Sequence, residues 1–239
     1  MAFAYQGSEL EVFAHARNWK RYFSSWLAPY ILGDVLEVGA GLGETARTLC
    51  DGRQTGWTSL EPDPALAREM QQRFLTAPLP APHRITVGKL SDLPSGSSFD
   101  TIVYIDVLEH IEDDRGELQQ AAGRLRRGGR LIVLAPAFQL LYTPFDHAVG
   151  HFRRYSAESL AGTRPESLQQ EKLFYLDSAG LVASLANLLL LRSAHPTLAQ
   201  IRFWDTVLVP VSRVLDPVIF HRAGRSIVAV LRAPLEPGG

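Results

Sequence analysis

The fold class of this chain is indicated by one stretch, Val35-Leu36-Glu37-Val38-Gly39-Ala40-Gly41-Leu42-Gly43-Glu44-Thr45-Ala46. Residues 35–38 have the apolar character of a buried strand, three glycines alternate with small or apolar residues, and a helical pattern continues through Leu49. Glycine allows a sharp turn at the end of a strand and brings main-chain N–H groups close to a ligand. A strand, a glycine turn and a helix in this order indicate a nucleotide-type ligand site in an α/β sheet.

Length and composition limit what the chain can be. Its 239 residues suit a single domain spanning 1–239, and its net charge of -1 creates no field that would attract nucleic acid. Cys50 is the sole cysteine, which excludes an intrachain disulfide and a cysteine metal cluster, and we expect no metal site. Residues 1–10 lack the features of a signal peptide, and the apolar runs at 131–135 and 227–231 are far shorter than the roughly 20 residues of a membrane span. A cytoplasmic protein without an integral membrane segment is therefore expected.

Two further strand ends carry acidic residues. The strand 57–61 ends on Glu61, about twenty residues past the glycine turn, where an acid can bind both ribose hydroxyls of a nucleotide. The alternative is a solvated glutamate at a strand end. The buried strand 99–105 runs into Asp106, at the edge where open α/β sheets bind ligands, and begins the string D-V-L-E-H-I at 106–111.

These motifs resemble those of the class I S-adenosylmethionine-dependent methyltransferases. The G-x-G-x-G spacing with Glu37 two residues before the first glycine resembles their motif I, D-V-L-E-H-I is closely similar to motif IV, and L-R-x-G-G at 125–129 is a further shared feature. Together the matches cover roughly residues 35–136. Lys89 departs from the family, which usually has an acid after the glycine that ends the third strand.

The resemblance implies a fold and a cofactor. The expected fold is α/β and Rossmann-like, with a seven-stranded, mostly parallel sheet of order 3-2-1-4-5-7-6, strand 7 antiparallel, helices on both faces, and a helical insertion between strands 6 and 7. The expected cofactor is S-adenosyl-L-methionine. The residues expected to bind it are Glu37, Gly39, Ala40, Gly41, Gly43, Glu61, Pro62, Leu90, Asp106 and Val107.

The loop at 141–156 is dense in His, Arg and Tyr, and its G-H-x-R-R-Y string resembles a bacterial methyltransferase subgroup. A hydroxyl acceptor must lose a proton, which makes His147 and His151 candidate general bases, although a loop histidine is more often structural. Arg153 and Arg154 are expected to bind an anionic group on the acceptor; equally, one of them pairs with Asp146 or Glu109 to fix the loop. The full set of expected acceptor-binding residues is Trp19, Tyr22, His110, Tyr142, Arg153, Arg154 and Tyr155.

Two helical segments are expected near this site. Residues 11–32 form an N-terminal helical cover, whose Trp19 and Tyr22 either wall the cavity or only cover the sheet edge. Residues 179–225 form a helical insertion, bent at Pro210, which is either a cap on the core or a lid for an apolar acceptor. Its excess of arginine favours an amphiphilic acceptor with an anionic head, or loose peripheral contact with a membrane.

Three functions remain open at this point. The first is a methyltransferase acting on a small-molecule acceptor. The second is an NAD(P)-dependent oxidoreductase, which is opposed by Glu44 because a dinucleotide fingerprint has its third glycine at that position. The third is a methyltransferase-like binding protein without turnover. The acceptor, the methylated atom and the oligomeric state are left open by the sequence.

Overall fold

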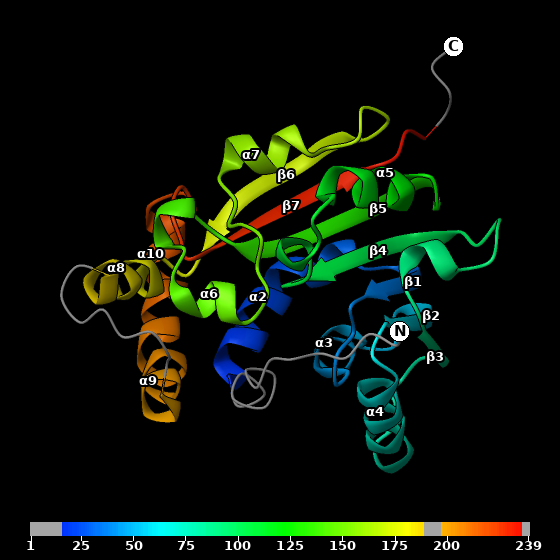
Figure 1. Ribbon diagram of the computed structural model, residues 1–239, viewed down its shortest axis with the longest axis horizontal. Coiled ribbons are helices and arrows are strands. Elements are labelled where there is room, and N and C mark those ends of the chain that lie inside the picture. The colour runs from blue at the N-terminus through cyan, green and yellow to red at the C-terminus, as the bar shows by residue number, and fades with distance from the viewer. Residues whose placement is uncertain (1–15, 189–196, 236–239) are drawn as a thin grey trace.

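The computed structural model contains one seven-stranded sheet with helices on both faces (Figure 1). It describes residues 16–188 and 197–235. The strand order is β3-β2-β1-β4-β5-β7-β6, and β7 runs antiparallel to both of its neighbours, which confirms the expected topology. The strands are β1 Gly33–Val38, β2 Gln54–Glu61, β3 His83–Val87, β4 Phe99–Ile105, β5 Leu125–Pro136, β6 Gln169–Leu176 and β7 Ser226–Arg232.

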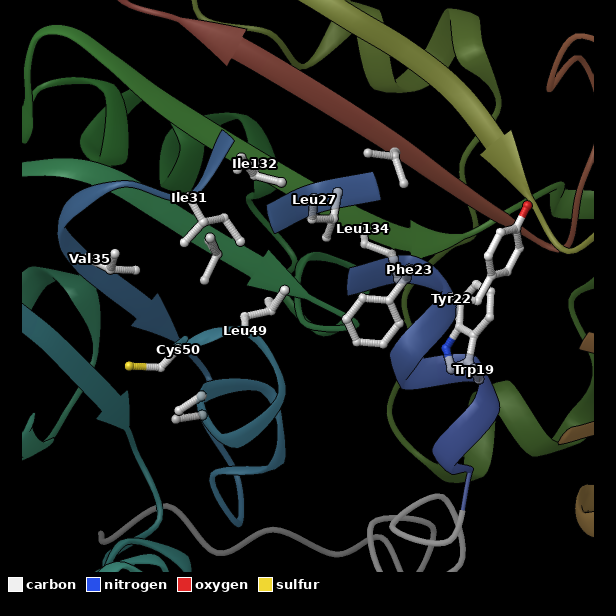
Figure 2. Close-up of a cluster of buried hydrophobic side chains, with 14 of the residues drawn as sticks. Trp19, Tyr22, Phe23, Leu27, Ile31, Val35, Leu49, Cys50, Ile132 and Leu134 are labelled. Atoms are coloured by element: carbon white, nitrogen blue, oxygen red, sulfur yellow. The ribbon is translucent and has the colours of Figure 1, made fainter. Parts of the chain in front are cut away.

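The sheet is buried on both faces because its central strands are apolar at nearly every position. Successive residues point to opposite faces, so Val35 of β1 joins one core cluster and Leu36 joins the other. On the first face the core includes α2 (Arg17–Leu27), α3 (Glu44–Leu49) and α4 (Pro64–Thr76); on the second it includes α5 (Asp114–Ala122) and α7 (Ala157–Gly162). Figure 2 shows part of the first cluster, in which four side chains of α2 (Trp19, Tyr22, Phe23 and Leu27) approach Ile132 and Leu134 of β5.

The helix before β5 ends earlier than the sequence pattern suggests. The basic residues Arg126 and Arg127, placed just before two glycines, predict a helix that ends there, but α5 ends at Ala122 and β5 begins at Leu125. Arg126 lies on the strand and pairs with Asp100 (2.7 Å) and Asp34 (3.3 Å). Arg126 is therefore explained by its ion pairs with Asp34 on β1 and Asp100 on β4, and not by the negative end of a helix dipole.

Residues 28–30 of the N-terminal segment form a short 3-10 turn, η1 (Ala28–Tyr30), and residues 11–15 lie outside the described part of the chain. No side chain adjacent in sequence caps the start of α2. Instead, the buried Asp205 accepts hydrogen bonds from the main-chain N–H groups of Asn18 (3.1 Å) and Trp19 (2.8 Å). A carboxylate at a helix N-terminus satisfies otherwise unpaired donors. The helix is thus fixed by a residue 187 positions away.

Asp205 belongs to the helical insertion between β6 and β7. Its described elements are α8 (Ser178–Ala186), α9 (Leu198–Phe203), the π-helical turn η6 (Trp204–Leu208) and α10 (Val209–Val218); residues 189–196 lie outside the description. Pro210 explains the wide turn, because proline cannot donate to the carbonyl of Thr206 and its ring pushes that carbonyl away. None of the helices in the described ranges is both long and apolar enough to cross a membrane.

A second buried carboxylate, Asp216 of α10, joins the insertion to the rest of the domain. It accepts hydrogen bonds from the Tyr22 hydroxyl (2.7 Å) and from the main-chain N–H groups of Asp177 (2.7 Å) and Ser178 (2.9 Å). Since Tyr22 lies on α2, the N-terminal helix and the insertion pack as one unit. In Figure 1 this unit lies at the end of the sheet to which β4 points.

Candidate active site

A cavity of about 250 Å³ opens at the carboxyl edge of the parallel strands. Its wall is formed by α2, the glycine loop after β1, the end of β4 with the following 3-10 turn η3 (Leu108–His110), the α6 (Pro144–Ala148) region, η6, and the start of β7. Ligands of open α/β sheets bind at this edge, beside the point where the strand order reverses between β1 and β4.

The glycine loop presents its backbone to this cavity. Gly39 has φ +68°, and a Cβ at this position would lie 2.6 Å from Cγ2 of Val107. The main-chain N–H groups of Gly39 and Ala40 both donate to the carbonyl of Leu60 (2.8 and 3.1 Å), which holds the loop against the end of β2. The sequence requires glycine here because both the backbone angle and the space exclude a side chain.

Glu61 braces the same loop from the end of β2. Its carboxylate accepts the main-chain N–H groups of Gly41 (2.7 Å) and Asp63 (2.8 Å), and only 4% of the residue is exposed. Burial raises the pKa of Glu61, against the pull of these two donors. Each oxygen retains acceptor capacity, since a carboxylate oxygen has two lone pairs. Glu61 is therefore tied to the loop and not a solvated strand-end residue.

Glu37 lies beneath the loop, turned away from the cavity. It accepts hydrogen bonds from Trp57 Nε1 (2.9 Å) and Ser59 Oγ (3.0 Å) on β2 and is 2% exposed. Burial raises its pKa to about 7, although these donors oppose the shift. The donors of β2 hold this carboxylate away from the cavity lining, and its expected contact with the cofactor stays a prediction.

Asp106 follows β4 with φ +54° and turns its carboxylate into the cavity. Asp106 is exposed to solvent within the cavity, yet desolvation by the surrounding protein raises its pKa to about 6, while His151, Arg225 and Arg154 oppose the rise. Glu109, three residues further along the chain, is 1% exposed. Its pKa is strongly raised, mainly by desolvation and in addition by repulsion from Asp106. Two acidic groups with perturbed pKa values in one cleft indicate a functional site.

A charged network fixes the opposite wall. Asp146 of α6 is fully buried and accepts hydrogen bonds from Arg154 Nε (2.8 Å), Arg154 Nη2 (3.0 Å) and the main-chain N–H of Thr143 (2.8 Å). Its Oδ1 also lies 2.9 Å from Nδ1 of His151. Burial alone would raise the pKa of Asp146, but bonds from His151 and Arg154 hold that pKa far below its usual value. An ionised Asp146 can only accept, so Nδ1 of His151 donates to it, and in the neutral form of the imidazole the lone pair is then on Nε2.

Some of the residues expected at the site line this cavity, and others do not. Those on its wall are Trp19, Gly39, Ala40, Gly41, Asp106, His110, His151 and Arg154. Those outside its lining are Tyr22, Glu37, Gly43, Glu61, Pro62, Leu90, Val107, Tyr142, His147, Arg153 and Tyr155. The expected site residues thus fall into two groups: residues that face the cavity, and residues that lie outside its lining.

Four expected site residues of the 141–156 loop lie outside the cavity lining: the acceptor-binding candidates Tyr142, Arg153 and Tyr155, and the candidate base His147. Tyr155 is 1% exposed and donates to Asp114 (2.8 Å), while Arg153 pairs with the same carboxylate (2.6 Å). The Tyr142 hydroxyl donates to the carbonyl of His151 (2.6 Å), and His147 is exposed to solvent on α6. The alternative in which an arginine pairs with Asp146 is the one that the structure contains, at Arg154.

Trp204 and Arg225 are among the wall residues that the sequence analysis missed. Trp204 of η6 lies 5.8 Å from Trp19, measured between ring centroids, and the guanidinium of Arg225 stacks on Trp204 at 4.6 Å. Arg225 immediately precedes β7. Because β7 is antiparallel to β5, its first residue lies at the carboxyl edge of the parallel strands, and that expected topology could have placed Arg225 at the site.

Comparison with known proteins agrees with this geometry. A family model described as a methyltransferase domain matches residues 36–131. A demethylmenaquinone methyltransferase of Tropheryma whipplei (strain Twist) is 33% identical over 140 residues, which are 56% of this chain and 54% of that protein. A tRNA U34 carboxymethyltransferase of Syntrophotalea carbinolica is 33% identical over 119 residues, 48% of this chain and 36% of that protein. The chain thus spans about half or less of the length of these curated relatives.

Among solved structures, the N-methyltransferase NodS from Bradyrhizobium japonicum, in complex with S-adenosyl-L-homocysteine, superimposes with a TM-score of 0.55 at 16% identity over 91% of this chain and 86% of that one. That likeness shows the shared fold. The sheet order and the glycine loop at its carboxyl edge define the class I S-adenosylmethionine-dependent methyltransferase fold. The fold of this chain is that of these methyltransferases, and its residues 36–131 match the model of a methyltransferase domain.

Proposed function

We propose that this protein transfers a methyl group from S-adenosylmethionine to a small, amphiphilic acceptor bound beside His151. One observation carries the proposal: a single cavity has the backbone of residues 39–42 on one side and Asp106, Glu109 and His151 on the other. A methyl donor on the glycine loop and an acceptor on the polar wall would share that space. The low net charge of the chain, -1, supports a small molecule over nucleic acid as the acceptor.

The residues present fit the methyl donor. The glycine at position 39 lets the loop pack closely on Val107, where a Cβ would collide, and the loop N–H of Gly41 is held in place by Glu61. We assign the ribose hydroxyls to Glu61 and the adenosine side to the neighbouring Pro62 and Leu90. When bound, S-adenosylmethionine supplies an activated methyl group, and the protein's contribution is to align the acceptor and exclude water.

His151 is the proposed general base for a hydroxyl acceptor. Asp146 holds its Nδ1–H, so the neutral imidazole would carry its lone pair on Nε2, as proton abstraction requires. The aromatic rings of Trp19 and Trp204 would shield the transfer from water. The proton would pass from the acceptor oxygen to Nε2 as the oxygen attacks the methyl carbon and the carbon–sulfur bond breaks.

The amphiphilic character of the acceptor is inferred from the surface of α9, η6 and α10. Large apolar side chains are exposed along this surface: Phe203, Val207, Val211, Val214, Leu215 and Val218. The exposed charged residues of this region, Arg202, Arg213 and Arg222, are all positive, because Asp205 and Asp216 are buried. An apolar face flanked by arginine suits the surface of an anionic membrane, from which a lipid-like acceptor could enter the cavity.

Cofactor binding is tested by calorimetry. We expect S-adenosylhomocysteine to bind with micromolar affinity, and Glu61→Ala to weaken this binding by about 1.5–3 kcal/mol, the value of a hydrogen bond to a charged group. NAD serves as the competing ligand, because Glu44, paired with Lys20 (2.7 Å), occupies the position of the third dinucleotide glycine. Tight NAD binding without any response to S-adenosylhomocysteine would refute the proposal.

Turnover is tested with a labelled methyl donor and a panel of hydroxylated amphiphiles. His151→Ala should lower the rate by about 10²–10⁴-fold while cofactor affinity stays within about twofold, since a base acts on the acceptor. His147→Ala is the matched control, because His147 lies on α6 with its side chain in solvent. Cofactor binding without label transfer to any acceptor would instead favour a binding protein without turnover.

The membrane proposal has its own assay. Binding to vesicles of anionic lipid should exceed binding to neutral vesicles, and Arg213→Glu should reduce it. Val214→Ser on the same surface should weaken binding without affecting cofactor affinity, since Val214 is far more exposed than buried (68%). Equal, weak association with both vesicle types would refute a membrane role and would mean that the surface of α9, η6 and α10 is only exposed to solvent.

A further inference from the structure

The floor of the cavity gathers three side chains that have the chemistry of metal ligands. One donor atom each from Glu109, His110 and His151 can be chosen so that all three lie within 4.8 Å of one another. The imidazole rings of His110 and His151 meet edge to face with centroids 4.5 Å apart. Nε2 of His151 lies 3.9 Å from Oε1 of Glu109. The sequence analysis expected no metal site, because it looked for cysteine clusters and read these residues separately.

Glu109 gives an independent indication that a ligand is needed here. The residue is 1% exposed, and its Oε2 is buried without a hydrogen-bond partner among the residues that the structure describes. A buried carboxylate oxygen without a donor is costly, and such groups are normally paired or bind a cation. Asp106 adds another carboxylate to the same wall. A cation placed among these groups would satisfy the unpaired oxygen.

The outer contacts of His151 match those of a metal-bound histidine. Its Nδ1 faces Asp146 at 2.9 Å, and Asp146 is held in turn by Arg154 and Thr143. A carboxylate on the far nitrogen of an imidazole fixes the ring and directs the other nitrogen at a metal ion. The same arrangement leaves Nε2 on the side where Glu109 lies.

From these contacts we propose that Glu109, His110 and His151 bind a divalent transition-metal ion with open positions facing the acceptor. Two imidazoles and one carboxylate suit Zn²⁺, Mn²⁺, Co²⁺ or Fe²⁺ and disfavour Mg²⁺ and Ca²⁺, which prefer oxygen ligands. Metal–ligand bonds of about 2.1 Å place donor atoms roughly 3.0–3.5 Å apart. The 3.9 Å between Nε2 of His151 and Oε1 of Glu109 would shorten by roughly 0.4–0.9 Å on binding, and a donor pair at the widest separation of 4.8 Å by roughly 1.3–1.8 Å.

The role of the ion rests on the methyl transfer of the proposed function and replaces its assignment of His151 as the general base. With the ion bound, the lone pair of His151 Nε2 serves the metal and no longer acts as a base. An acceptor hydroxyl bound at an open position would have a lowered pKa and would release its proton to water before methyl transfer. The oxygen then forms a bond to the methyl carbon as the carbon–sulfur bond breaks, and S-adenosylhomocysteine leaves.

Metal binding is measured first without any methyl donor. The protein is prepared without a polyhistidine tag, stripped with EDTA and dialysed against Zn²⁺, Mn²⁺ or Co²⁺, and the bound metal is quantified. We expect one ion per chain, a visible absorption band with Co²⁺, and weak binding of Mg²⁺. Glu109→Gln and His110→Gln should each reduce affinity at least tenfold, while His147→Ala should bind as the unaltered protein does.

Folding of each variant is checked by circular dichroism, and the unaltered chain supplies a measurement that needs no variant. Its melting temperature should rise with Zn²⁺ or Mn²⁺ concentration and return after chelation. Absence of stoichiometric metal, or equal binding by all three variants, would overturn the inference even if S-adenosylhomocysteine binds. Metal binding without methyl transfer would instead overturn the proposed function and leave the metal site standing.

Discussion

The ionisation of Glu37 offers a sharp test of how the glycine loop is supported. Glu37 is buried between β1 and β2, where desolvation raises its pKa from 4.5 to about 7. The folded protein therefore retains a proton that the unfolded chain releases above pH 4.5. The contribution of Glu37 to stability is fully present below about pH 4.5 and is lost as the pH rises toward 7. At about 1.4 kcal/mol for each unit, the loss amounts to about 3 kcal/mol.

Glu37→Gln removes this titration and keeps the size of the side chain. Urea unfolding of both proteins, followed by tryptophan fluorescence between pH 4.5 and 8.5, gives two stability curves whose difference isolates Glu37 from other groups such as Asp106. We expect the stability of the unaltered protein relative to Glu37→Gln to fall by about 3 kcal/mol over this range. Glu158→Gln, at an exposed carboxylate on α7, serves as control. A difference that stays constant within about 1 kcal/mol, or rises with pH, would show that Glu37 is ionised throughout and refute the reasoning.

Three further outcomes follow from single contacts. Gly39→Ala should weaken S-adenosylhomocysteine binding more than tenfold in calorimetry. The new Cβ would meet Val107, and a φ of +68° costs a residue with a side chain about 1–2 kcal/mol more. Unchanged affinity would contradict the assignment of this loop to the cofactor. Asp146→Asn should lower the free energy of unfolding by about 3–5 kcal/mol, since Arg154 would keep a buried charge without its partner; a loss below about 1 kcal/mol in urea would mean that the network relaxes into solvent. Asp205→Ala should cost about 1–2 kcal/mol by removing the cap of α2, with a matching loss of helical circular dichroism; an unchanged spectrum and midpoint would show that the cap is dispensable.

The sheet could be predicted from the sequence because its signals are local. The glycine spacing after β1 and the acid at the end of β4 each follow a short apolar strand, and together they identify a fold whose strand order is fixed. The boundary between α5 and β5 was wrong for the opposite reason. Arg126 pairs with Asp34 and Asp100, which lie on two other strands, and no local pattern reveals such partners.

The 141–156 loop shows where prediction from composition ends. The loop contains several histidine, arginine and tyrosine residues, and the residue types alone do not reveal which of their side chains face the cavity. A short parallel bridge between Ala137 and Tyr155 turns the tyrosine under the loop, where it donates to Asp114. Asp146 draws His151 and Arg154 to the other side. The direction of each side chain therefore depends on a partner distant in sequence, and Glu109 with His110 became a candidate metal site only once His151 was placed beside them.

The insertion between β6 and β7 has two functions that a deletion could not separate. Asp205 caps α2, and Asp216 holds both the Tyr22 hydroxyl and the turn into α8, so removal of the insertion would unpair buried donors across the domain. Trp204 of the same segment lines the cavity beside Trp19. Loss of turnover after deletion would therefore report unfolding as readily as loss of a lid. Substitution of Trp204 by Leu keeps an apolar side chain on the wall and leaves Asp205 and Asp216 in place. If that variant retains its stability but loses turnover, the insertion acts on the acceptor; if turnover persists, its role is to hold α2.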